Sequence, residues 1–255
     1  MLRETVARLR QGHRTIRYPR GPAEVPDRLR GGPVLDTTRC QSECVECIET
    51  CPTNALRRDE EGLALDMGRC LFCGDCAEQC PADAIAFTTE HRLAAKQREQ
   101  LVVRSRLERA GVELEQRLRR LFGRSLRLRQ VSAGGCNACE ADFNVLGTIG
   151  WDLGRFGIQP VASPRHADGL LVTGPVTRNM RFALEKTYAA VPTPKIVIAL
   201  GACAISGGPF AGHEETWDGV DQVLPVDLYI PGCPPHPLTI LEGLLALLGR
   251  VDRDR

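Results

Sequence analysis

Residues 70–81 read CLFCGDCAEQCP, in which two, two and three residues separate four cysteines and a proline follows the last. This is the spacing of a bacterial 4Fe–4S run, whose first three thiolates bind one cluster and whose fourth reaches a neighbouring cluster. A related run, CQSECVECIETCP, lies at residues 40–52. The two runs together predict one small domain that holds two clusters and therefore carries electrons.

Each run is expected to supply its fourth cysteine to the cluster of the other run. The first cluster then has the ligands Cys40, Cys44, Cys47 and Cys80, and the second has the ligands Cys51, Cys70, Cys73 and Cys76. The first run departs from the usual pattern, because three residues rather than two separate Cys40 from Cys44. That inserted residue makes Cys40 the ligand that the spacing supports least.

Clustered cysteines also occur in zinc ribbons and in disulfide frameworks, and both alternatives fit less well. Zinc ribbons have CxxC pairs about 15–20 residues apart, whereas four thiols crowd into each of these runs, with Pro52 and Pro81 after the last. Disulfides are typical of secreted chains, and residues 1–30 contain no apolar core of a signal peptide. We therefore expect a reduced, cytoplasmic setting.

The 255 residues suit two modest domains, and the formal net charge of +1 hides an uneven distribution. At residues 91–129, twelve Lys or Arg stand against four Glu. Nucleic-acid binding is one explanation, but aromatic residues that could stack on bases are nearly absent there, and a solvated or partner-facing helix explains the charge. No apolar run reaches about 18 residues, so we expect no membrane-spanning helix.

The pattern along the chain divides it into four segments. A short amphipathic helix at residues 2–9 opens a segment without ligands, which fits either a frayed end or a docking arm. The cysteine-rich part has a strand–turn–strand at 54–65 and a last strand at 84–87. One apolar stripe then predicts a helix, formed by Leu107, Leu114, Leu118 and Leu121. The expected segments are a docking arm (1–32), a two-cluster domain (33–90), a basic helical linker (91–124) and a last domain (125–255).

The last domain has the pattern of a parallel α/β sheet, because short apolar runs alternate with helical stretches. The apolar runs are residues 126–131, 170–172, 196–200 and 226–230, and the helical stretches include 178–190 and 237–248. Sites in such sheets form beyond the carboxyl ends of the strands. The predicted fold class is an α+β two-cluster ferredoxin domain followed by an α/β domain with a parallel sheet.

The remaining four cysteines lie where a third cluster could form at that edge: Cys136, Cys139, Cys203 and Cys233. Glycines lie beside these cysteines or follow the apolar run at 170–172, and they are Gly135, Gly174, Gly201 and Gly232. Because glycine has no side chain, the backbone at these positions can approach a cluster closely. Because 63 residues separate Cys139 from Cys203, spacing alone leaves zinc or simply buried thiols as alternatives.

Four stretches resemble, in order, the motifs of the small subunit of membrane-associated group 4 NiFe hydrogenases, a relative of the 20 kDa-type subunit of respiratory complex I. They are SLRLRQVSAGGCNACEADFNVL (125–146), LLVTGPVTRN (170–179), IVIALGACAISGG (196–208) and DLYIPGCPPHP (227–237). Separately, residues 14–88, with TIRYP and both CP-terminated runs, resemble the two-cluster ferredoxin-like subunit of the same complexes. The chain looks like a fusion of the two.

The resemblance implies a flavodoxin-like second domain, with a proximal 4Fe–4S cluster on Cys136, Cys139, Cys203 and Cys233 lying against a large subunit. Three clusters in all would relay electrons between a donor or acceptor protein and a NiFe site in that separate subunit. Membrane-arm subunits would hold the complex on the cytoplasmic face of the inner membrane. We expect no catalytic residue in this chain, because it has neither nickel-ligand motifs nor a nucleotide fingerprint.

Three details refine this resemblance. Hydrogenase small subunits carry CxxC at the first ligand pair, as GCNACE does here, whereas complex I subunits carry adjacent cysteines, so a hydrogenase-type complex is favoured over a quinone-linked one. His236 replaces the family's usual arginine and could couple reduction to protonation, or simply open the last helix. Glu140 could contact the large-subunit interface, or cap the helix after Cys139.

Overall fold

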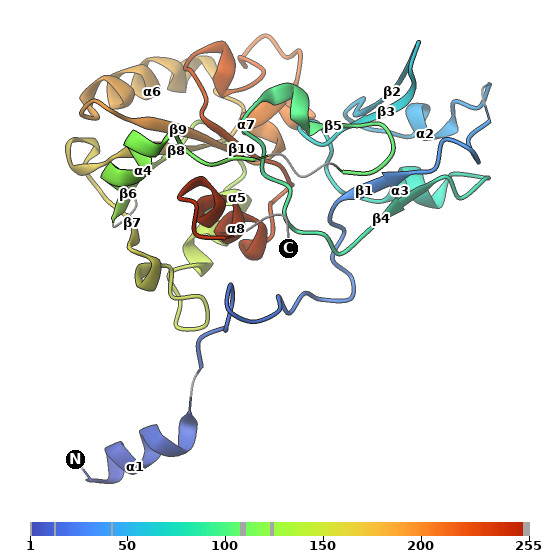
Figure 1. Cartoon of the computed structure of the whole chain (residues 1–255). Coiled ribbons are helices and arrows are strands. Elements are labelled where there is room, and N and C mark those ends of the chain that lie inside the picture. The colour runs from blue at the N-terminus through green and yellow to red at the C-terminus, as the bar shows by residue number, and fades with distance from the viewer. Residues whose placement is uncertain (1, 13, 42, 108–110, 123–124, 252–255) are drawn as a thin grey trace.

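The computed structural model describes residues 2–12, 14–41, 43–107, 111–122 and 125–251, which form two lobes and a projecting helix (Figure 1). That helix is α1 (Leu2–Gln11), and none of its residues is buried. The chain then follows the larger lobe, where the Ile16 amide donates to the Gly150 carbonyl and the Arg155 guanidinium to the Tyr18 carbonyl, both at 2.8 Å. This part of the expected docking arm thus contacts the chain's own second domain.

The smaller lobe contains both cysteine runs between short antiparallel strands. Its elements are β1 (Pro33–Leu35), α2 (Glu46–Glu49), β2 (Leu56–Asp59), β3 (Gly62–Asp66), α3 (Asp75–Glu78) and β4 (Ile85–Phe87). β1 pairs with β4, and β2 pairs with β3 as the predicted strand–turn–strand. β4 is not the last strand, because β5 (Val102–Val103) also pairs with β3. The α+β character predicted for this lobe is confirmed.

Residues 91–124 differ from the predicted helical linker. Their described part holds a 3-10 helix, η1 (Arg98–Leu101), then β5, and a single α-helix, α4 (Gln116–Phe122); residues 108–110 and 123–124 lie outside it. The expected stripe does not form, because Leu114 is buried while Leu121 is 53% exposed. Ala95 instead pairs with Tyr229 of the larger lobe, so the segment joins the lobes as extended chain.

The larger lobe is an α/β domain with a parallel sheet, as the sequence predicts, and the sheet has one strand, β7 (Ile158–Pro160), beyond the four predicted. Its main elements are β6 (Leu126–Ser132), α5 (Ala138–Val145), β7 (Ile158–Pro160), β8 (Gly169–Thr173), α6 (Arg178–Ala190), β9 (Ile196–Leu200), α7 (Ala202–Ser206), β10 (Leu228–Ile230) and α8 (Pro237–Leu247). The sheet order is β10-β9-β8-β6-β7. Short 3-10 helices are η2 (Leu153–Phe156), η3 (Pro164–His166), η4 (Gly208–Phe210) and η5 (Val220–Gln222).

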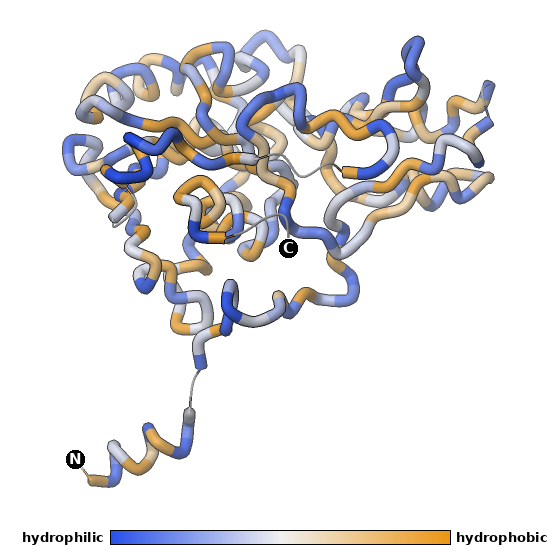
Figure 2. Tube along the Cα trace, viewed as in Figure 1, coloured by the Kyte–Doolittle hydropathy of each residue, from blue (hydrophilic) through white to orange (hydrophobic). Residues whose placement is uncertain are grey.

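Two apolar cores lie on the two faces of this sheet. Every residue of β8 and β9 is buried, and these strands carry long apolar stretches in Figure 2. α5 and α8 pack on one face. α6 and α7 pack on the other, in a core that continues into the smaller lobe (Figure 1). The shared core fixes the position of one lobe against the other.

Candidate iron–sulfur sites

The structure gathers the eight cysteines of the smaller lobe into two groups, each lining its own hollow. One hollow is lined by Cys40, Cys44, Cys47 and Cys80. The other is lined by Cys51, Cys70, Cys73 and Cys76. The fourth cysteine of each run thus lies with the first three of the other run. The structure groups the thiols as the crossed ligation requires, and binding of clusters by them stays a prediction.

Backbone turns around these cysteines aim N–H groups at the sulfur atoms. The Ala55 amide donates to Cys51 Sγ at 3.2 Å, and the Ala84 amide donates to Cys80 Sγ at 3.3 Å, each four residues after the cysteine. The Phe72 amide donates to Cys70 Sγ at 3.3 Å. Donors to sulfur stabilise thiolate and cluster charge, and are one of the ways a protein tunes an iron–sulfur site.

Three buried thiols of these hollows, those of Cys47, Cys70 and Cys76, have pKa values above the ordinary value of a thiol. Burial, with a smaller contribution from neighbouring cysteines, raises the pKa values of Cys70 and Cys76 to about 12. Burial and the nearby Cys40 and Cys80 also raise the pKa of Cys47. A bound metal centre offsets both effects and holds thiols in the ionised form. Four thiols, sulfur-directed donors and a hollow therefore fit an iron–sulfur cluster.

The zinc alternative requires four ligands that converge on one ion at about 2.3 Å. Among the described residues, no set of three or more His, Cys, Asp or Glu side chains is arranged to hold a metal ion. The thiols instead surround a hollow, as they do when four thiolates bind the separate irons of one cluster.

The third group lies at the carboxyl edge of the parallel sheet. Cys136 follows β6, Cys139 lies on α5, Cys203 lies on α7 after β9, and Cys233 follows β10. Burial, with added repulsion from Cys233 and Cys136, raises the pKa of Cys203 to about 11, and burial also raises the pKa of Cys139. Cys136 and Cys233 are exposed. Cys139 and Cys203 lie near enough to the other thiols of the group for their charges to interact, at an edge that is partly open to solvent.

The predicted glycines have different neighbours. Gly201 has φ +90°, and a Cβ there would lie 2.5 Å from Cys139 Sγ, so only glycine fits against this sulfur. Gly135 and Gly174 approach each other's backbone, and Gly232 packs on Pro235. Sequence reasoning missed Gly208, where an added Cβ would lie 3.0 Å from Cys203 Sγ. The Gly207–Gly208 pair, which ends five residues after that cysteine, is the sequence feature that could have indicated it.

Glu140 and His236 are held by specific hydrogen bonds. Glu140 is buried, and Thr173 Oγ1 donates to its Oε1 at 2.6 Å across the edge of the sheet. His236 begins α8, where its Nδ1 accepts from the Leu238 amide at 3.1 Å, in agreement with the simpler of its two expected roles. Burial lowers the pKa of His236. Roles for either residue in redox chemistry stay predictions.

A hydrogen bond that no sequence motif predicted connects the segments that carry the second and third cysteine groups. Ser206, on α7 with Cys203, donates from its Oγ to the Gly68 carbonyl at 2.9 Å, and both residues lie at a buried contact between the lobes. The Gly68 amide in turn donates to Asp66, which makes a two-bond ion pair with Arg98. The loop before Cys70 and the helix carrying Cys203 are thereby fixed to each other.

Fold and site together define a dicluster ferredoxin domain joined to a parallel α/β domain that carries a further cysteine site. Comparison with known proteins supports both halves. Residues 38–84 match the 4Fe-4S dicluster domain, and residues 136–247 match the family of the NADH ubiquinone oxidoreductase 20 Kd subunit.

Among its relatives, the chain is 47% identical over 131 residues to formate hydrogenlyase subunit 7 of Escherichia coli, covering 51% of each protein. It is 43% identical over 141 residues to the probable membrane-bound hydrogenase subunit mbhJ of Pyrococcus furiosus, covering 54% of this chain and 84% of that protein. It is 44% identical over 116 residues to an NADH-quinone oxidoreductase subunit from Bacteroides thetaiotaomicron, covering 45% of this chain and 59% of that protein.

The chain therefore belongs to the family of the 20 kDa subunit of NADH:ubiquinone oxidoreductase, with a dicluster domain ahead of it. It spans about half the length of the E. coli relative and most of the P. furiosus one. None of the helices in the described part of the chain has the length and apolar character needed to cross a bilayer.

Proposed function

We propose that this chain is an electron-transfer subunit that carries three 4Fe–4S clusters and relays electrons between a donor or acceptor protein and the NiFe large subunit of a membrane-bound hydrogenase complex. The observation that carries the proposal is the gathering of the twelve cysteines into three groups of four within one chain. Its relatives are named as subunits of hydrogenase, formate hydrogenlyase and NADH-quinone oxidoreductase complexes.

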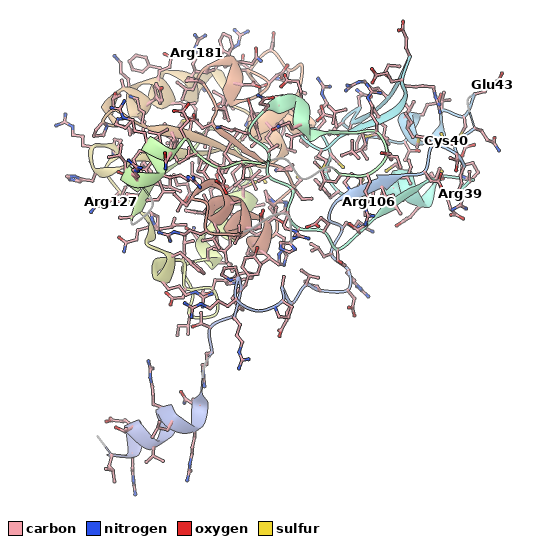
Figure 3. The ribbon with its side chains drawn as sticks, in the orientation of Figure 1. Arg39, Cys40, Glu43, Arg106, Arg127 and Arg181 are labelled. Atoms are coloured by element: carbon pink, nitrogen blue, oxygen red, sulfur yellow. The ribbon has the colours of Figure 1, made fainter. Side chains whose placement is uncertain are left out.

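The groups lie in an order that suits a relay. Cys40, of the first group, lies toward the end of the smaller lobe remote from the larger one (Figure 3). The Gly68–Ser206 hydrogen bond joins the loop before Cys70, of the second group, to the helix that carries Cys203, of the third group. Cys136 and Cys233 are exposed, which makes the carboxyl edge of the parallel sheet the proposed contact with the large subunit. The strand order 2-1-3-4-5 supports the flavodoxin-like fold for this domain.

When bound, a 4Fe–4S cluster supplies a carrier that accepts and releases one electron at a time. The chain's own residues would hold the three clusters through Cys40, Cys44, Cys47 and Cys80, through Cys51, Cys70, Cys73 and Cys76, and through Cys136, Cys139, Cys203 and Cys233. Its amides stabilise sulfur charge, and apolar side chains such as Leu63 and Leu65 line the two hollows and exclude water. The shared core keeps the distances between sites constant.

The chain would act as a non-catalytic subunit, peripheral on the cytoplasmic face of the membrane and held there by membrane-arm subunits. The same relay in a quinone-linked, complex I-like enzyme is the second candidate, favoured by the NADH-quinone oxidoreductase relatives. The CxxC pair at Cys136 and Cys139 favours the hydrogenase. The large subunit that co-purifies with this chain decides between them: two CxxC nickel-ligand pairs in its sequence, with hydrogen-dependent dye reduction, support the hydrogenase.

The cluster content is tested by anaerobic reconstitution of the full chain, followed by iron, sulfide and zinc analysis. We expect about twelve irons and twelve sulfides per chain and broad absorbance near 400 nm. A colourless protein, or one that binds about three zinc ions instead, would overturn the proposal.

A further inference from the structure

One charged side chain reaches the first cysteine group. We propose that Arg58, on β2, sets the reduction potential of the cluster bound by Cys40, Cys44, Cys47 and Cys80, and raises it above that of the neighbouring cluster. The inference rests on the proposed function, since it needs a cluster at this group.

Arg58 contacts the first run on both sides of its unusual three-residue spacing. Its Nη2 lies 3.4 Å from Cys40 Sγ and also donates to the Gln41 carbonyl at 3.3 Å and the Cys44 carbonyl at 3.2 Å. Its Nε is buried, and no described group accepts a hydrogen bond from it. The guanidinium is therefore held in the loop around Cys40 rather than in solvent, and it closes the longer first loop against β2.

The charge of this contact determines its effect on redox chemistry. Reduction adds one negative charge to the group that Cys40 would hold, and a positive N–H donor at the sulfur stabilises the reduced state more than the oxidised one. A guanidinium stays protonated at all accessible pH values, so this effect does not vary with pH. The potential of the first cluster should therefore be raised by a constant amount.

The second group has no such charged contact among the described residues. The sulfur atoms of Cys51 and Cys70 accept from the backbone amides of Ala55 and Phe72, and Cys51 Sγ also lies 3.9 Å from the neutral Thr53 hydroxyl. The first group has one backbone donor of the same kind, the Ala84 amide, and the guanidinium in addition. Hydrogen bonds with an ionised partner are about twice as strong as neutral ones. An electron on the smaller lobe would then reside mainly on the first cluster, the one nearer the end of the lobe, where a soluble redox partner would dock.

The test compares the reconstituted wild-type chain with Arg58→Gln, which keeps an N–H donor and removes the charge. Arg57→Gln is the matched control, because Arg57 is the adjacent residue of β2, on the opposite face of the strand, with a half-exposed side chain beside Asp59. Redox titration followed by EPR, with iron analysis of each sample, gives the potentials of the separate clusters.

We expect Arg58→Gln to keep its iron and to lower one potential by about 59 mV or more, which is a tenfold change in a one-electron equilibrium. The shift should be equal at pH 7 and pH 9, and Arg57→Gln should match the wild type. If Arg58→Gln loses iron, Arg58→Met decides, because methionine keeps most of the side chain's length without its charge: a lowered potential supports the role and an unchanged one overturns it. Full iron with unchanged potentials in Arg58→Gln overturns the inference alone, whereas a wild-type chain lacking iron overturns the proposed function.

Discussion

The two lobes gather their cysteines by opposite routes. In the smaller lobe, two runs of 12 or 13 residues supply every thiol, and the turns within each run place them. In the larger lobe, Cys136, Cys139, Cys203 and Cys233 meet only because β6, β9 and β10 end at one edge. The first arrangement depends on local spacing, and the second depends on a completed fold.

The same contrast extends to what stabilises each lobe. The larger lobe has a sheet whose central strands are wholly buried, with helices on both faces. The strands of the smaller lobe have two to five residues, and its buried residues include Cys47, Cys70 and Cys76 themselves. A cluster there would form part of a small core, whereas the third cluster would lie at an edge of a domain that has a large core of its own.

Removal of iron should therefore have the largest effect, and an unequal one. After anaerobic chelation, we expect amides of β2 and β3 to lose protection from hydrogen exchange while those of β8 and β9 keep it, because the hollows leave the smaller lobe without part of its core. Hydrogen-exchange mass spectrometry of the holo and apo chains measures this. Equal loss of protection in both lobes would contradict the comparison.

Sequence reasoning succeeded where the pattern is local or strongly apolar. The run at residues 70–81 indicated the two-cluster domain, and the predicted strand at 196–200 and helix at 178–190 match β9 and α6 residue for residue. β7 was missed because it has only three residues, of which two are exposed. Convergence of the third cysteine group was expected from the rule for strand ends.

The linker could not be predicted correctly from its own residues. Its leucine spacing fits a helix, but tertiary pairing overrides that preference where Ala95 meets Tyr229 and Val103 meets Leu65. Ser206 and Arg58 were missed for a related reason: each acts through a partner more than ten residues away, and neither belongs to a spacing motif.

A substitution at Gly201 should separate the two kinds of site. Gly201→Ala places a Cβ against Cys139 Sγ and forces an alanine to φ +90°, a conformation that costs about 1–3 kcal/mol. We expect loss of the third cluster alone, so that about eight of about twelve irons remain. Gly150→Ala is the control, since its Cβ would meet nothing within 4 Å. Iron analysis that finds every site filled in Gly201→Ala would show that this sulfur tolerates the methyl group.

The contact between the lobes predicts a smaller effect. Ser206→Ala removes the donor to the Gly68 carbonyl and leaves that buried acceptor without it, at a cost of about 1–3 kcal/mol. We expect denaturant unfolding of the holo chain at a lower midpoint, with the iron content unchanged. Ser125→Ala, at an exposed position just before β6, should leave the midpoint within error of the wild type. Equal midpoints for the two variants would exclude a stabilising role for Ser206.

The smallest predicted effect concerns Tyr229, where β10 meets Ala95 between the lobes. Burial, and then the charge of Asp221, raises the pKa of this phenol to about 12, from about 10 in an unfolded chain. The neutral phenol therefore contributes to stability fully below pH 10, and that contribution is lost as the pH rises toward 12. We expect the free energy of unfolding to fall over this interval in the wild type and to fall less in Tyr229→Phe. Parallel curves for the two chains would mean that Tyr229 ionises as freely in the folded state as in the unfolded one.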